Sequence, residues 1–185
     1  QKGWLPLSRE ALERAIERRQ LVLENRRLEE QLTRTRETRS RFYGLVGSHP
    51  SMLELYRLIE TIAHEPDPVL IIGETGTGKE LVARAIHDCG FRRSQAFIVQ
   101  NCASLPENLL ESELFGYRKG AFTGADRDRQ GLFAAAHTGM VHLDEIGDIS
   151  GPVQTKLLRF LQNGEIRPVG SNTTRQVDVR VIAST

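Results

Sequence analysis

Cysteine is scarce in this sequence, and its placement excludes two classes of site. The 185 residues include only Cys89 and Cys102, and neither lies in a C-x-x-C or Cys/His spacing that binds a metal or forms a redox centre. No apolar run approaches the roughly 18 residues of a membrane span, and the start from Gln1 to Trp4 lacks the apolar core of a signal peptide. We therefore expect reduced thiols, no membrane partner and a cytoplasmic protein.

A large excess of either charge is also missing. Lys and Arg total 25 against 24 Asp and Glu, a net charge of +1, so the whole chain offers no strongly basic surface for nucleic-acid phosphates. Hydrophobic residues make up 39% and charged residues 26%, which is typical of a folded globular protein. The length suits one α/β domain with an additional arm. Because the sequence does not begin with Met and ends on an apolar run at Thr185, we expect a fragment of a longer protein.

Proline and glycine are absent from Ser8 to about Arg41, where Leu, Glu, Arg and Gln dominate. This composition predicts a long helix. Its second part has a coiled-coil seam, in which an Asn at an a position favours a two-stranded partner. The alternative stays open that this is an amphipathic helix with one solvated face, which packs against its own domain. The seam residues are Leu21, Asn25, Leu28 and Leu32.

Gly44 and Gly47, followed by Pro50, separate this helix from a globular region. We therefore predict two parts, a linker helix over residues 1–43 and a core over 44–185. The core begins with a helix from Met52 to Ile62, and strands then alternate with helices, which predicts a parallel sheet flanked by helices. The predicted strands are 69–72, 96–99, 140–143 and 177–182, and the predicted helices are 80–89 and 153–162.

A glycine-rich loop follows the first predicted strand of the core. It has the G-x-x-x-x-G-K spacing of a Walker A loop, in which glycines free the backbone N–H groups for a polyphosphate and a helix N-terminus adds its positive dipole. The lysine supplies a charge for the β and γ phosphates. Glu80 departs from the general motif, which has Ser or Thr there to help hold Mg²⁺, so a glycine-rich turn with a surface lysine is the alternative. The loop comprises Gly73, Glu74, Thr75, Gly76, Thr77, Gly78, Lys79 and Glu80.

Two acids end the predicted strand that starts at Met140. An apolar strand that ends in two acids is the Walker B arrangement, in which Asp144 holds Mg²⁺ and Glu145 polarises the attacking water. Such a pair occurs often by chance, but with the loop it predicts an ATP site. We expect His142 to be a packed or hydrogen-bonded strand residue rather than a ligand.

A third motif carries a resemblance to a known family. The segment Gly120, Ala121, Phe122, Thr123, Gly124 and Ala125 is an unbroken GAFTGA loop, and it resembles the signature of sigma-54-dependent transcription activators, the bacterial enhancer-binding proteins. In that family Glu80 is the usual residue at its position, so the departure becomes support. The similarity covers about residues 45–185. It continues through Asn101 to Ala103, Leu143 to Asp148, Gln154 to Arg159 and Arg167 to Gly170.

The resemblance implies a fold and a mechanism. The fold is an AAA+ P-loop NTPase core that binds ATP and Mg²⁺ and acts as an ATPase within a homo-oligomeric ring. Asn101 and Glu145 form a pair that senses the nucleotide, and the 120–125 loop contacts sigma-54 RNA polymerase holoenzyme to promote open-complex formation. Ala134 and the stretch from Thr138 to Met140 depart from the family pattern near the Walker B strand.

The resemblance also implies parts that we expect beyond this chain. The family's arginine fingers, helical lid and C-terminal helix-turn-helix lie past the position of Thr185, so we expect upstream DNA to be bound only through that absent domain and the isolated chain to be nearly inactive. The start from Gly3 to Leu7 resembles the end of a receiver domain, which implies two-component control. Two rival functions stay open: a P-loop enzyme with another client, and a regulatory module that binds nucleotide without hydrolysing it.

Overall fold

The computed structural model describes residues 18–21, 23–24 and 41–185. Residues 18–21 and 23–24 are helical, as predicted, whereas Asn25, Leu28 and Leu32 of the predicted coiled-coil seam lie outside the described residues. By its contacts the chain divides into two units, the larger of which comprises residues 42–45 and 54–185. Within the described ranges no helix is long and apolar enough to cross a membrane. The boundary predicted between residues 43 and 44 stays a prediction.

A four-stranded parallel sheet lies at the centre of the larger unit. Its strands are β3 (Val69–Ile71), β4 (Phe97–Asn101), β7 (Met140–Asp144) and β10 (Arg180–Ser184). Their order in the sheet is β3-β10-β7-β4, and every pairing is parallel. The predicted parallel sheet is confirmed. Strands next to one another in space, such as β3 and β10, are therefore far apart in sequence.

The last predicted strand, residues 177–182, is shifted in the structure. Val177 pairs through its backbone N–H with the carbonyl of Gly164, and Asp178 accepts from the N–H of Thr138, so both precede β10. Val177 is nevertheless buried in the core. The apolar pattern was correct about burial but wrong about the start of the strand, because burial alone does not distinguish a core loop from a strand.

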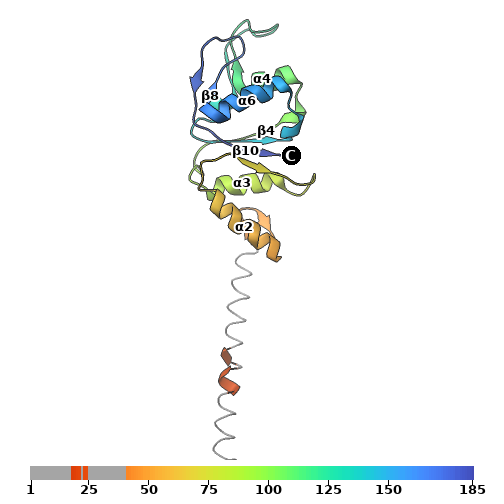
Figure 1. Cartoon of the computed structure of the whole chain (residues 1–185), viewed down its shortest axis with the longest axis vertical. Helices are drawn as coiled ribbons and strands as arrows, with labels where there is room; N and C mark the ends of the chain where they lie inside the picture. Colours follow the sequence, from red (N-terminus) through yellow and green to blue (C-terminus); the bar gives the residue numbers. More distant parts are fainter. Residues whose placement is uncertain (1–17, 22, 25–40) are drawn as a thin grey trace, which may run out of the picture. The chain divides into compact units, whose positions relative to one another are not determined.

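Helices cover both faces of the sheet (Figure 1). On one face lies α3 (Lys79–Cys89), and on the other lie α4 (Glu107–Phe115) and α6 (Gly151–Asn163). Each predicted helix of the core is present, because the apolar positions recur at helical spacing and Gly164 ends α6 in the left-handed conformation. The remaining helical segments are α2 (Pro50–Ile62), α5 (Leu132–Ala135) and the 3-10 turns η1 (Cys102–Ser104) and η2 (Ile146–Asp148).

The hydrophobic core fills the space between the sheet and the α4–α6 face. Phe133 packs against Phe115 and Phe160, with ring centroids 5.4 and 4.2 Å apart. All three side chains are buried, and each contributes roughly 1.5–3 kcal/mol through the burial of apolar surface. This core fixes the sheet against α4 and α6, and so fixes the carboxyl ends of its strands.

Three short hairpins were not predicted, because two-residue strands have no periodicity to detect. They are β1 (Arg41–Phe42) with β2 (Leu45–Val46), β5 (Gly116–Tyr117) with β6 (Arg129–Gln130), and β8 (Glu165–Ile166) with β9 (Arg175–Gln176). At Gly116, φ is +78° and an added Cβ would lie 2.5 Å from the carbonyl oxygen of Arg129, so only glycine fits where α4 turns into β5. The β5–β6 and β8–β9 hairpins extend from the α4–α6 side of the sheet (Figure 1).

Candidate nucleotide site and distal loop

The glycine-rich loop begins where two strands that are distant in sequence lie side by side. The backbone N–H of Gly73 donates to the carbonyl of Thr185 (3.2 Å), and the N–H of Thr185 donates to the carbonyl of Ile71 (3.1 Å). These bonds join the end of β3 to the end of β10. The loop therefore lies at the carboxyl edge of the parallel sheet, where α/β proteins of this kind bind their ligands.

The loop has the backbone geometry of an anion-binding turn. Gly76 and Gly78 have φ of +82° and +87°, a region that side-chain-bearing residues rarely adopt. Thr77 closes the turn through its hydroxyl, which donates to the carbonyl of Glu74 (2.8 Å). Within the described residues no acceptor is bonded to the backbone N–H of Gly76 or Gly78, and α3 begins at Lys79. Unpaired donors and a helix N-terminus thus coincide, which suits a phosphate group.

Lys79 is not a surface lysine, so the alternative of a plain glycine-rich turn is wrong on this point. Its side chain is buried, with 9% exposure. Its ammonium donates to the carbonyls of Gly73 (2.9 Å) and Glu74 (3.3 Å). Both partners are neutral, so this positive charge is free to neutralise an anion held by the same loop. The exposed Glu80 forms a 3.9 Å ion pair with Arg84 instead.

Asp144 ends β7 at the same edge. Its Oδ1 accepts from the hydroxyl of Ser184 (2.5 Å), and its Oδ2 accepts a long bond from the amide of Asn101 (3.5 Å). In the described part of the chain no group of three or more His, Cys, Asp or Glu side chains could hold a metal alone. A single carboxylate beside a phosphate loop fits Mg²⁺, which is commonly bound by one or two carboxylates together with substrate phosphates and water.

Glu145 has a strained backbone. Its φ and ψ are 50° and 52°, the left-handed region, at the point where β7 turns into η2. Such a conformation costs a non-glycine residue about 1–3 kcal/mol and is found most often at functional sites. No hydrogen bond of the Glu145 side chain occurs within the described residues, which leaves the carboxylate available to a reacting water.

Asn101 ends β4 next to Asp144. Its side-chain oxygen accepts from the backbone N–H of Ala103 (2.9 Å) and begins η1, so this side chain caps the turn that follows the strand. Its amide reaches Asp144 rather than Glu145, and in the described residues no hydrogen bond joins Asn101 to Glu145. The predicted Asn101–Glu145 sensing pair stays a prediction.

His142 and Ser184 lie behind Asp144 at this edge of the sheet and are hydrogen-bonded in a row with it. His142 is fully buried and hydrogen-bonded through Nε2 to the hydroxyl of Ser184 (2.8 Å), which confirms that it is a packed strand residue. Burial lowers the pKa of His142, although the nearby Asp144 carboxylate acts to raise it. Ser184 is not among the predicted site residues, although a small polar residue in the apolar run of β10 was a signal.

Cys102, which follows Asn101, is also buried close to this edge. Its burial raises the pKa of the thiol to about 11, and the negative charges of Asp144 and Asp148 act in the same direction.

The 120–125 loop forms a separate, exposed turn. The N–H of Gly120 donates to the carbonyl of Ala125 (2.8 Å), and the N–H of Ala125 donates to the carbonyl of Phe122 (3.0 Å). The side chain of Phe122 is 41% exposed, and its ring meets Tyr117 edge to face at 4.9 Å. Thr123 is exposed, and only Ala125 is buried within the loop.

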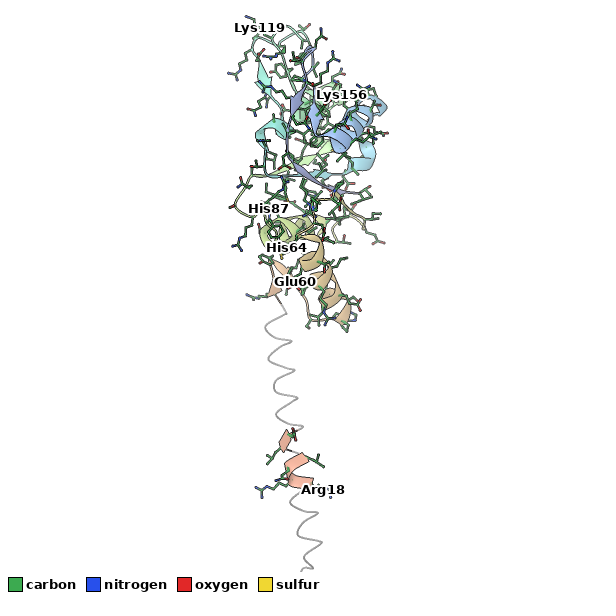
Figure 2. The ribbon with its side chains drawn as sticks, turned by 60° about the vertical axis from the view of Figure 1, so that its left-hand side comes forward. Arg18, Glu60, His64, His87, Lys119 and Lys156 are labelled. Atoms are coloured by element: carbon green, nitrogen blue, oxygen red, sulfur yellow. The ribbon has the colours of Figure 1, made fainter. Side chains whose placement is uncertain are left out.

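Asp128 fixes the base of this loop. Its carboxylate accepts from the backbone N–H of Lys119 (2.8 Å) and pairs with the Arg118 guanidinium, and these bonds lower the pKa of Asp128. Figure 2 shows Lys119 at the end of the larger unit opposite His64 and His87. The structure thus brings together the Walker A loop, Asn101, Asp144 and Glu145, and it places the 120–125 loop in a second, distal position.

Comparison with known proteins places these sites in context. The family model of the sigma-54 interaction domain matches residues 45–185 of this chain. The transcriptional regulatory protein ZraR of Salmonella typhimurium is 51% identical over 165 residues, 85% of this chain and 37% of its own length. The hydrogenase transcriptional regulatory protein HoxA of Cupriavidus necator is 61% identical over 118 residues, 64% of this chain and 24% of its own length. The chain therefore spans about a quarter to somewhat over a third of these curated relatives.

Solved structures agree with the fold. Crystal structures of NtrX from Brucella abortus in complex with ATP and with ADP both superimpose with a TM-score of 0.70, at 35% and 34% identity. Each comparison covers 90% of this chain, and the chain covers 36% and 35% of the NtrX chains. The sheet order, the flanking helices and the loop at the carboxyl edge are those of an AAA+ P-loop NTPase core.

Proposed function

Because the chain belongs to the sigma-54 interaction domain family, we propose that it is the ATP-hydrolysing core of an activator that remodels sigma-54 RNA polymerase holoenzyme. The observation that carries this proposal is the pairing of two sites in one unit. A phosphate loop with a buried lysine lies at the sheet edge, and an exposed GAFTGA turn lies at the distal end (Figure 2). ATP hydrolysis at the first site drives the second against the polymerase.

The residues at the sheet edge divide the work of binding and hydrolysis. Gly76 and Gly78 present backbone N–H groups to the phosphates, and Lys79 exchanges its carbonyl partners for phosphate oxygens. Asp144 holds Mg²⁺, which when bound neutralises charge on the phosphates. Glu145 orients the attacking water and accepts its proton. The remaining loop residues, Gly73, Glu74, Thr75, Thr77 and Glu80, shape the cradle.

A continuous stretch of chain links the two sites. Asn101 contacts Asp144 and caps η1. After η1 the chain enters α4, which ends at Phe115, and the distal hairpin begins at Gly116. A change in the partner of Asn101, from Asp144 to Glu145 when ATP is present, would shift the start of α4. Because both sites bias the position of this one helix, α4 can transmit the nucleotide state to Thr123.

The activity requires an assembly and an input. We propose that the protein works in the cytoplasm as a homo-oligomer, dimeric through the linker helix predicted over residues 1–43 and ring-shaped when active. Promoter-upstream DNA is bound by a C-terminal domain outside this chain, and a receiver domain places the activator under two-component control. The basis for these proposals is the family resemblance, together with the coiled-coil pattern at Leu21 and Asn25.

The test is open-complex formation on a sigma-54 promoter by the intact protein. With ATP, we expect heparin-resistant complexes with sigma-54 holoenzyme, and none with a non-hydrolysable ATP analogue. A holoenzyme that carries a different sigma factor serves as the control and should not respond. Open complexes formed equally well without hydrolysis, or failure to engage sigma-54 at all, would contradict the proposal.

A further inference from the structure

A chain of hydrogen bonds runs behind Asp144 on one face of the sheet. His142 lies opposite Ile182 in the parallel register of β7 and β10. Because side chains on a strand alternate between faces, Asp144 and Ser184, each two residues further on, point to that same face. His142 Nε2 lies 2.8 Å from Ser184 Oγ, and Ser184 Oγ lies 2.5 Å from Asp144 Oδ1.

The carboxylate fixes the direction of these bonds. A carboxylate only accepts, so the Ser184 hydroxyl must donate its single hydrogen to Asp144. The hydroxyl then offers His142 only lone pairs, and His142 Nε2 must carry a hydrogen and donate. At 2.5 Å the bond to Asp144 lies in the range of charge-assisted O–H to carboxylate bonds, which are about twice as strong as neutral ones.

The other ring nitrogen of His142 supports this direction. His142 Nδ1 is buried and has no hydrogen-bond partner within the described residues. With the hydrogen on Nε2, Nδ1 of the neutral ring is a bare acceptor, whereas the opposite tautomer would bury an unpaired N–H and leave the hydroxyl facing two acceptors. His142 and Ser184 are both fully buried, so water does not compete for either bond.

We propose that His142 and Ser184 are positioning residues that hold Asp144 through Oδ1 and so fix the orientation in which its carboxylate would bind Mg²⁺ at the nucleotide edge. This inference rests on the proposed function, because it assumes that Asp144 holds Mg²⁺. Without Ser184, Asp144 would keep only the 3.5 Å bond from Asn101 and would sample other rotamers. Partners that orient a metal-binding carboxylate affect metal affinity although they never touch the metal.

The experiment measures metal affinity directly. Mn²⁺ replaces Mg²⁺, and its binding to the intact protein saturated with ADP is followed by electron paramagnetic resonance. We expect Ser184→Ala to raise the Mn²⁺ dissociation constant about 10-fold, the lower end of the usual effect of losing such a partner. ADP affinity measured with EDTA should stay within about twofold of the wild type, because the phosphate loop is untouched.

Matched variants separate positioning from packing. Ser184→Thr keeps the hydroxyl and should retain wild-type Mn²⁺ affinity. His142→Gln keeps an N–H donor and should also retain it, whereas His142→Leu should weaken it. Ile182→Val removes volume from the same face of β10 without touching the bonded chain, and it should leave Mn²⁺ binding unchanged. In the wild type, ¹⁵N NMR should report the Nε2–H tautomer for His142.

The outcomes distinguish this inference from the function on which it rests. If Asp144→Ala abolishes Mn²⁺ binding but Ser184→Ala, with EDTA-measured ADP affinity intact, leaves it unchanged, the positioning role is wrong and the metal site stands. If Asp144→Ala has no effect, both are wrong. If Ile182→Val weakens Mn²⁺ binding as much as Ser184→Ala does, the effect is packing and the inference is overturned. The opposite tautomer of His142 would overturn it as well.

Discussion

At the scale of single residues, the charge of Lys79 dominates the phosphate loop. We predict that Lys79→Ala weakens ATP binding by about 100-fold, since losing charged hydrogen bonds worth about 3 kcal/mol corresponds to that factor. Titration with a fluorescent ATP analogue measures the affinity. Lys119→Ala, the same substitution at the distal loop (Figure 2), is the matched control and should bind ATP as the wild type does. Equal binding by both variants would refute the Walker A assignment.

Glu145 provides a contrasting test at the same edge. Its side chain makes no hydrogen bond in the described residues, so Glu145→Gln keeps the shape of the site while removing the base. We predict that ATP affinity is retained and that turnover falls by about 10²–10⁴-fold, the usual contribution of a general base. Binding and steady-state hydrolysis measured on one preparation separate the two effects. Loss of binding equal to that of Lys79→Ala would contradict the role given to Glu145.

Arg180 controls stability rather than chemistry. Its guanidinium is buried, with 3% exposure, and donates to the carbonyls of Ile62 (2.6 Å), Ala63 (3.1 Å) and Asp67 (3.0 Å). Burial lowers its pKa. Arg180→Met leaves these carbonyls without donors, and we predict a loss of about 2–4 kcal/mol in the free energy of unfolding. Urea denaturation measures this loss, and an unchanged midpoint would show that water replaces the guanidinium.

At the scale of elements, the distal turn should be separable from the nucleotide site. Thr123 is exposed, and Gly120 and Gly124 on either side of it have φ of +80° and +96° with nothing near an added Cβ, so the Thr123 side chain can be removed without disturbing the turn. We predict that Thr123→Ala leaves ATP hydrolysis and assembly within about twofold of the wild type but eliminates sigma-54 engagement and open-complex formation. Binding to sigma-54 and promoter opening are measured in parallel.

The control for this element is an exposed threonine elsewhere. Thr155 on α6 donates only to the carbonyl of Gly151 in its own helix (3.0 Å), so Thr155→Ala removes a hydroxyl without affecting the distal turn. It should activate transcription normally. Normal activation by Thr123→Ala, or a loss caused by its unfolding, would show that the turn is not the coupling device.

At the scale of the whole molecule, the proposed ring should supply an arginine to the nucleotide site. Among the described residues, Arg84 is the only arginine paired with the phosphate loop, and it binds Glu80 at 3.9 Å with its side chain half exposed. An arginine supplied from a neighbouring subunit contributes roughly 10³–10⁵ in rate. We predict that the turnover per subunit of the intact protein rises steeply with its concentration as the proposed ring assembles. Hydrolysis rates compared with sedimentation measure this, and a concentration-independent rate would contradict ring-dependent activity.

The sequence by itself determined the local chemistry of this protein. The spacing from Gly73 to Lys79, the acids Asp144 and Glu145, and the 120–125 turn are each contiguous segments. Their backbone freedom, charge and neighbouring elements are all encoded within a few residues. The periodicity of the apolar residues around these segments predicted that the loop and the acids follow strand ends. The alternation of strands with helices then predicted the parallel sheet. For this reason the sequence could place these segments at one edge of the sheet before the structure was known, while their roles in ATP binding stay predictions.

Only the tertiary structure decided which distant residues meet. The sheet order β3-β10-β7-β4 places the last strand between the first and third, and nothing local in the sequence specifies that order. It brings Ser184 to Asp144 and His142, which lie about 40 positions earlier in the chain. It also brings Arg180 to the end of α2, 118 positions away from Ile62. Such bonds depend on strand order and register, which arise from packing of the whole core rather than from any local pattern.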